Sequence, residues 1–139
     1  MRRVLSIILF VGMVFSGQGC MVVAVGLGAA GTIAYVSGDL QAEESESIDV
    51  VYEAALKAVK DLELPITSQS KDALVAEITT YDAQDKKIRI KLKAKTDKTT
   101  ELSIRVGVFG SETKSRLIYE KIRDHLRDMR EDRQNGAKS

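Results

Sequence analysis

Hydrophobic residues between positions 48 and 62 recur with the period of an α-helix. They stand at positions i, i+3, i+4, i+7, i+8, i+11 and i+14: Ile48, Val51, Tyr52, Ala55, Leu56, Val59 and Leu62. This spacing places them on one face of an amphipathic helix. Ser47 suits the N-cap position and Asp49 the positive end of the helix dipole. The helix must end before Pro65, the only proline in the chain.

Segments that favour β-strands follow the proline. The segment 73–81 is rich in β-forming residues, while 86–95 and 100–109 alternate between polar and apolar positions. The apolar series of the last two segments comprise Ile88, Ile90, Leu92 and Ala94, then Leu102, Ile104, Val106 and Val108. Such alternation is typical of an antiparallel sheet that buries one face. Weaker strand signals occur at 36–42, before the helix, and at 66–70.

The last two strands predict a hairpin. Both apolar series occupy even-numbered positions, so directly paired positions must sum to an even number if the series are to share a face. A two-residue loop gives an odd sum and would turn one strand over. A three-residue loop at 97–99 satisfies the parity and is common in hairpins. It predicts Leu92 opposite Ile104 and Lys95 opposite Glu101.

A second helix begins beyond Gly110, with Ser111 as its N-cap and Glu112 in its first turn. Its packed side comprises Ile118, Ile122, His125, Leu126 and Met129. The resulting order is β-α-β-β-β-β-α. Two helices on one face of an antiparallel sheet of about four to five strands make a two-layer α+β domain. We assign this domain to residues 38–133 and a disordered tail to residues 134–139.

The first nineteen residues have the layout of a secretory signal peptide. Arg2 and Arg3 form a positive region, residues 4–15 are apolar, and residues 16–19 are small or flexible. The apolar part is shorter than a membrane-spanning helix, which needs roughly 20 apolar residues. Residues 1–19 are therefore predicted to be removed.

Cys20 stands where a bacterial lipoprotein carries its lipid-modified cysteine. Gly19 and Cys20 fit the lipobox, whereas Gly17 and Gln18 depart from its usual residues. We expect lipid modification of Cys20, which would hold the protein to a membrane because each buried methylene contributes about 0.8 kcal/mol. In the alternative topology Cys20 is not processed, and residues 4–36 insert as one uncleaved span with the arginines inside.

Residues 20–37 include a glycine-rich apolar segment in which Gly26, Gly28 and Gly31 match the spacing of a dinucleotide-binding turn. That motif needs a preceding strand and a following crossover helix within a βαβ unit. Only five residues separate Cys20 from Gly26, and a crossover pattern does not follow. We therefore expect no dinucleotide, and interpret the segment as membrane-proximal.

The inventory of reactive side chains is small. The chain has one cysteine and one histidine, which excludes an internal disulfide and the usual cysteine and histidine metal sites. The acidic run at 43–46 lacks the spacing of a calcium loop. Asp124 beside His125 has no identifiable nucleophile partner. These features predict a protein that is not an enzyme, with no cofactor and no metal.

The most suggestive chemistry is cationic and lies on the two alternating strands. The residues concerned are Lys87, Arg89, Lys91, Lys93, Lys95 and Arg105. Such a face could contact anionic lipid head groups, lipopolysaccharide or another acidic envelope polymer. It could equally be a solvated face whose lysines discourage aggregation. Nucleic acid is not expected as a partner, because the near-neutral net charge and the lack of interleaved aromatic residues argue against it.

Several segments together resemble one family of bacterial lipoproteins. These are the glycine-rich run after Cys20, then "YVSGDL", "VYEAALKAVKDLELPI", "SKDAL", "IKLKAK" and "ELSIRVGVFG". They are similar to the domain-of-unknown-function family 3568 over residues 20–126. The resemblance implies an envelope lipoprotein with a small α+β domain and no established activity.

The sequence as a whole predicts a lipid-anchored binding or scaffold domain of the cell envelope with a protein or anionic polymer as partner. Met21 is not an aspartate, which by analogy with enteric sorting favours the outer membrane, facing the periplasm. The alternative is a small-ligand-binding or enzymatic domain with a pocket beneath the helices, lined by Tyr52 or Tyr119.

Overall fold

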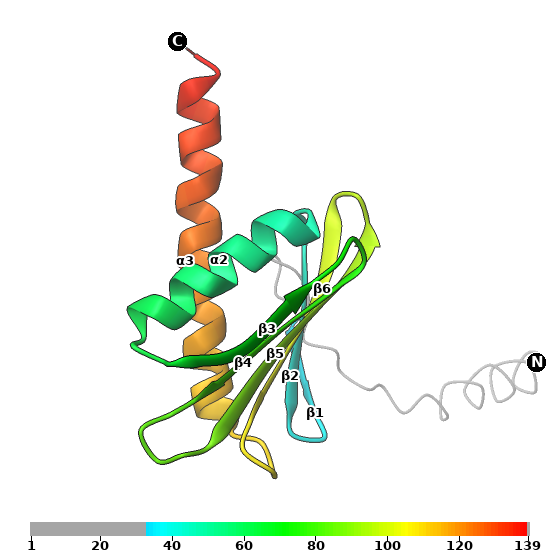
Figure 1. Ribbon diagram of the computed structural model, residues 1–139. Helices are drawn as coiled ribbons and strands as arrows, with labels where there is room; N and C mark the ends of the chain where they lie inside the picture. Colours follow the sequence, from blue (N-terminus) through cyan, green and yellow to red (C-terminus); the bar gives the residue numbers. More distant parts are fainter. Residues whose placement is uncertain (1–32, 139) are drawn as a thin grey trace, which may run out of the picture.

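The computed structural model describes residues 33–138, which form one sheet and two helices (Figure 1). The predicted signal peptide, Cys20 and residues 21–32 lie outside the described residues. The elements in chain order are β1 (Ile33–Val36), β2 (Asp39–Glu44), α2 (Ile48–Asp61), β3 (Ile66–Lys71), β4 (Val75–Tyr81), β5 (Lys87–Thr96), β6 (Thr99–Val106) and α3 (Glu112–Gly136).

The strands form one antiparallel sheet in the order β1-β2-β6-β5-β4-β3, which confirms the α+β class. The strand expected at 36–42 is divided by a turn at Ser37 and Gly38, so two strands precede the first helix and the sheet has six. Both turn residues have positive φ, of 51° and 89°, which is the conformation of a two-residue hairpin turn of type I′. The sheet therefore starts at Ile33, before the expected domain boundary at 38, and α3 continues past 133 to Gly136.

The core lies between α2, α3 and one face of the sheet, which we call the inner face. Its strand residues are Leu40, Ala42, Ala76, Ile78, Ile88, Ile90, Leu92, Leu102, Ile104 and Val106. Each is at most 3% exposed, so the predicted apolar series of β5 and β6 face the helices as expected. Val108 is the exception: the sequence placed it in this series, but it is 78% exposed because Gly107, with φ of 74°, ends the strand.

The predicted pairing of the β5–β6 hairpin is wrong by two positions. Leu92 lies opposite Leu102, and Glu101 lies opposite Lys93. The loop holds two residues, 97 and 98, and a β-bulge between Ala94 and Thr96 supplies the extra residue that restores the parity. The apolar series consequently share a face, although their partners differ from those predicted.

Both helices begin where the sequence predicts. Ser47 and Ser111 occupy the N-cap positions in extended conformation, although neither side chain makes a capping hydrogen bond. Their carbonyl oxygens instead accept the first helical hydrogen bonds, from the backbone N–H groups of Val51 and Ser115.

Three connections meet at the lower end of the sheet in Figure 1, which we call the loop end: the β1–β2 turn, the β4–β5 turn and the loop from Gly107 to Ser111. The first and last of these touch. A Cβ atom added to Gly38 would lie 2.7 Å from the carbonyl oxygen of Phe109, and one added to Gly110 would overlap the backbone of Gly38. Glycine at both positions therefore allows the two loops to pack against each other.

We expect Gly110→Ala to destabilise the protein by about 2–4 kcal/mol, because the new methyl group adds a clash to the strain of φ at 82°. Gly107→Ala is the matched control. It has a similar φ of 74°, and an added Cβ would meet only the Lys86 side chain at an ordinary contact distance of 3.8 Å, so only the backbone strain of about 1–2 kcal/mol remains. Urea denaturation followed by circular dichroism measures both. Equal losses would contradict the close approach of the two loops.

Candidate functional site

The sheet face opposite the helices, which we call the outer face, carries the cationic residues singled out in the sequence. Lys87, Arg89, Lys91 and Lys93 alternate along β5 with the buried series, and Arg105 of β6 lies opposite Arg89. Lys95 follows at the bulge. The structure thus brings the predicted residues to one surface.

Acidic side chains from neighbouring strands share the outer face, and of these only Glu101 was expected there, as a partner of Lys95. Glu77 lies 3.4 Å from Arg89 and 3.9 Å from Lys91. Lys95 lies 3.1 Å from Glu101, and Arg105 3.0 Å from Asp39. With Glu43 the face holds four acidic and six basic side chains, so it remains only mildly positive. Exposed pairs of this kind contribute little stability.

A cleft of about 640 Å³ opens where the outer face meets the loop end. It is lined by Asp85, Lys86, Lys87, Arg89, Arg105 and residues 106–111. The pocket considered in the alternative hypothesis would instead lie on the other side of the sheet, beneath the helices. Neither Tyr52 nor Tyr119, its expected lining, belongs to this cleft.

Arg105 organises the loop end. One guanidinium nitrogen donates to the carbonyl oxygen of Ser37 and to the carboxylate of Asp39, at 3.2 and 3.0 Å. The other donates to the carbonyl oxygen of Val108 at 2.9 Å. Arg105 therefore fixes the β1–β2 turn and the 107–111 loop relative to each other, rather than presenting an uncommitted charge.

The β4–β5 turn is fixed in a similar way by Asp82. Its carboxylate accepts hydrogen bonds from the backbone N–H groups of Gln84 and Lys86, both at 2.9 Å, and pairs with the ammonium group of Lys114 on α3. Lys114 and these backbone donors lower the pKa of Asp82 to about 2. This contact ties the turn to the first part of α3.

We expect Lys114→Met to raise the pKa of Asp82 from about 2 toward its usual 3.8, since the strongest partner of the carboxylate is lost. Because the folded-state pKa is lowered, the stability gained from Asp82 is present above pH 3.8 and is lost as the pH falls toward 2. NMR titration of the carboxyl group measures the shift. Lys121→Met, on the same helix but beside Asp61, should leave Asp82 unchanged. An unmoved Asp82 pKa in Lys114→Met would contradict the pairing.

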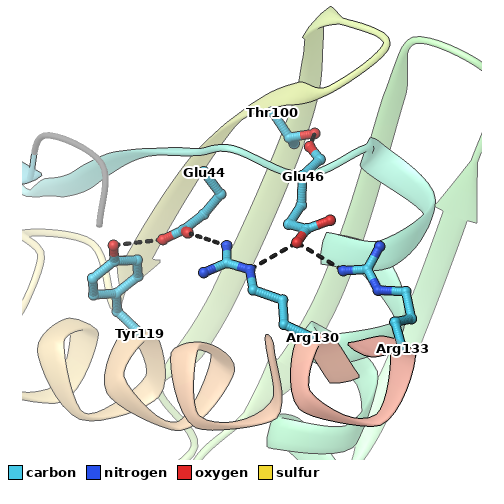
Figure 2. Close-up of polar contacts among 6 residues, drawn as sticks. All are labelled: Glu44, Glu46, Thr100, Tyr119, Arg130 and Arg133. Carbon is cyan, nitrogen blue, oxygen red and sulfur yellow. Dashed lines mark hydrogen bonds and ion pairs between the residues drawn. The ribbon is translucent and has the colours of Figure 1, made fainter. Parts of the chain in front are cut away.

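A second polar group connects α3 to β2 and to the segment that follows β2 (Figure 2). Glu44 is 2% exposed and accepts a hydrogen bond of 2.6 Å from the hydroxyl of Tyr119. Glu46 accepts hydrogen bonds of 2.7 Å from both Arg130 and Arg133. We call these five residues the carboxylate–arginine cluster.

The cluster fixes α3 to the segment that leads into α2. The hydroxyl of Thr100 donates to the carbonyl oxygen of Glu46 at 2.8 Å, which attaches the same segment to β6. Every buried side-chain nitrogen and oxygen among the described residues has a hydrogen-bond partner. Such full pairing is what makes buried polar groups tolerable.

Burial and hydrogen bonding shift two pKa values in the cluster. Burial and the carboxylate of Glu44 raise the pKa of Tyr119, so its hydroxyl stays protonated and continues to donate. Burial alone would raise the pKa of Glu46, but the hydrogen bonds from Arg130 and Arg133 outweigh it and lower that pKa. The arrangement thus stabilises an ionised Glu46 beside two arginines.

We expect Glu46→Gln to cost about 1–3 kcal/mol at neutral pH, because two charge-assisted hydrogen bonds are weakened. A lowered folded-state pKa means that this contribution is present above the usual 4.5 and is lost as the pH falls below it. The difference from the unsubstituted protein should therefore shrink in acid. Urea denaturation across pH measures it, with Glu131→Gln on the exposed side of α3 as control. A pH-independent difference would contradict the ion pairs.

His125 joins the two helices. Its Nε2 atom lies 2.9 Å from the carboxylate of Asp61 at the end of α2, rather than pairing with its neighbour Asp124. Within residues 33–138 there is no group of three or more histidine, cysteine, aspartate or glutamate residues that could hold a metal ion. Nor does that region contain a helix long and apolar enough to cross a membrane.

The fold and its surfaces define a two-layer α+β domain with a mildly basic outer face and a rigid loop end. Comparison with known families then identifies the chain. Residues 3–125 match the family described as protein of unknown function DUF3568, and the chain belongs to this family. A search of curated proteins finds no match.

Proposed function

We propose that the protein is a lipoprotein of the bacterial cell envelope, anchored through lipid on Cys20, whose domain serves as a non-catalytic binding or scaffold module. The observation that carries this proposal is the asymmetry of the sheet. Its inner face is covered by two helices, while its outer face is open and mildly positive. An open basic face suits contact with an anionic surface or an acidic partner.

The N-terminal sequence supports the anchor. A positive region, a short apolar region and small residues precede Cys20, as in lipoprotein precursors. Lipid on the cysteine would hold the domain at a membrane. We place the protein at the outer membrane, facing the periplasm, because Met21 follows the cysteine.

The alternative, a small-ligand-binding or enzymatic domain with a pocket beneath the helices, has weaker support. Tyr119, an expected lining residue, is 1% exposed and its hydroxyl is engaged by Glu44. The cleft at the loop end lies on the outer face of the sheet, away from the helices. Its lining includes Arg105, which holds the loops together.

The anchor is tested by expressing the full chain and Cys20→Ser in a bacterial host with labelled palmitate. We expect label on the unsubstituted chain and none on Cys20→Ser, because the thiol is the acceptor of the lipid. Membrane fractionation and the mass of each product accompany the labelling. Absence of label, with both chains in the membrane at full precursor mass, would overturn the lipoprotein proposal and favour an uncleaved span over residues 4–36.

A further inference from the structure

The tip of the loop end is apolar and projects into solvent. Phe109 is 92% exposed and Val108 is 78% exposed, the two highest values among the exposed large hydrophobic residues of the described chain. Val36, at the end of β1, adds a half-exposed side chain beside the β1–β2 turn. Isolated exposed apolar residues are ordinary. Two adjacent ones at the tip of a fixed loop form a small apolar projection.

Basic side chains stand beside this projection. Lys86 and Lys87 are exposed and line the cleft together with Val108 and Phe109. Neither lysine has an acidic partner within 4 Å among residues 33–138, whereas Arg89, Lys91, Lys95 and Arg105 of the outer face each have one. The loop end therefore combines an aromatic tip with unpaired positive charge.

The projection is held rigidly before any contact is made. Arg105 bonds the carbonyl of Val108, Gly38 packs against Gly110, and Asp82 fixes the adjacent turn to Lys114. Ordering a loop costs free energy when it happens on binding. Here the folded domain has already ordered these loops.

The covalent distance from the expected anchor permits contact. Twelve residues separate Cys20 from Ile33, and an extended chain of that length reaches about 40 Å. The strand β1 has four residues, so Ile33 lies only about 10 Å from the loop end. The loop end can thus reach the bilayer that holds Cys20.

We propose that the loop end docks on an anionic phospholipid bilayer, with Phe109 and Val108 among the lipids and Lys86 and Lys87 at the head groups. Aromatic and aliphatic side chains flanked by lysine are the composition of surfaces that lie in a membrane interface. The proposal rests on the proposed anchor for its location. It adds an orientation, in which the far end of α3 points away from the membrane (Figure 1).

The chain contains no tryptophan, so a single substitution creates a unique fluorescent reporter. The full chain carrying Phe109→Trp is reconstituted into vesicles of phosphatidylcholine and phosphatidylglycerol in equal parts. We expect its fluorescence to be quenched by lipids brominated on their acyl chains and protected from iodide in the water. Leu74→Trp is the matched control, since Leu74 is 66% exposed in the β3–β4 turn at the other end of the sheet. The tryptophan at position 74 should be quenched by iodide and not by brominated lipids.

Charge is tested in the Phe109→Trp chain. Lys86→Gln and Lys87→Gln should each lower the ratio of docked to undocked protein about fivefold, as expected for one basic residue at an anionic surface. Lys98→Gln removes an exposed lysine from the β5–β6 loop, at the other end, and should change nothing. Vesicles of phosphatidylcholine alone should also reduce docking.

Three results would overturn the docking proposal. In the first, iodide quenches the tryptophan at position 109 in vesicles. In the second, brominated lipids quench the tryptophans at 74 and 109 equally. In the third, the tryptophan at 109 becomes better protected from iodide as the protein density rises, but brominated lipids do not quench it. The last result would mean that a second copy covers the tip. If Cys20 is labelled with palmitate but brominated lipids do not quench the tryptophan at 109, the docking proposal fails and the anchor proposal stands. Lipid quenching at 109 without palmitate removes the proposed anchor and leaves the docking in place.

Discussion

Between β1 and β6 lies β2, whose hydrogen bonds to β6 pair residues 39–44 with residues 100–105. This pairing closes the long chain segment between β2 and β6, and the closure costs conformational entropy. Contacts that only this pairing creates must recover that cost. It sets Leu40 and Ala42 into the core, Asp39 beside Arg105, and Glu44 beneath α3. The turn before β2 then meets the loop after β6. The core, the carboxylate–arginine cluster and the loop end all depend on this one strand.

Local patterns were sufficient for the elements whose signal is repeated many times. The first helix and the alternation along β5 and β6 each rest on several residues with one period, so a single irregular position does not alter the result. The β1–β2 turn and the bulge after Ala94 were missed because each depends on one or two backbone angles. The spacing of apolar residues carries no information about the positive φ of Ser37. The bulge has no glycine near it that could have indicated its position.

The candidate site was predictable only in part, for the same reason. Alternation alone places the basic residues of β5 on one face. Of their acidic neighbours, Glu101 was expected opposite Lys95, whereas Glu77 belongs to a strand whose register the sequence left open. Glu77 alternates with Ala76 and Ile78, which was the available signal for its position on the outer face. The loop end draws on three connections separated by some twenty residues or more, and the glycines around Val108 and Phe109 were its only local sign. Tertiary pairing, rather than local sequence, assembles this surface.

The first strand also determines how the domain responds to mechanical load. β1 lies at the sheet edge, is bonded only to β2, and begins the described chain at Ile33. Tension applied through the preceding chain is directed at four residues, whose hydrogen bonds can open one after another from that end. Beyond them the load meets β2, which keeps its pairing with β6 and is covered by α3. The edge strand can therefore peel away as an extensible leader, while the two-layer body remains folded.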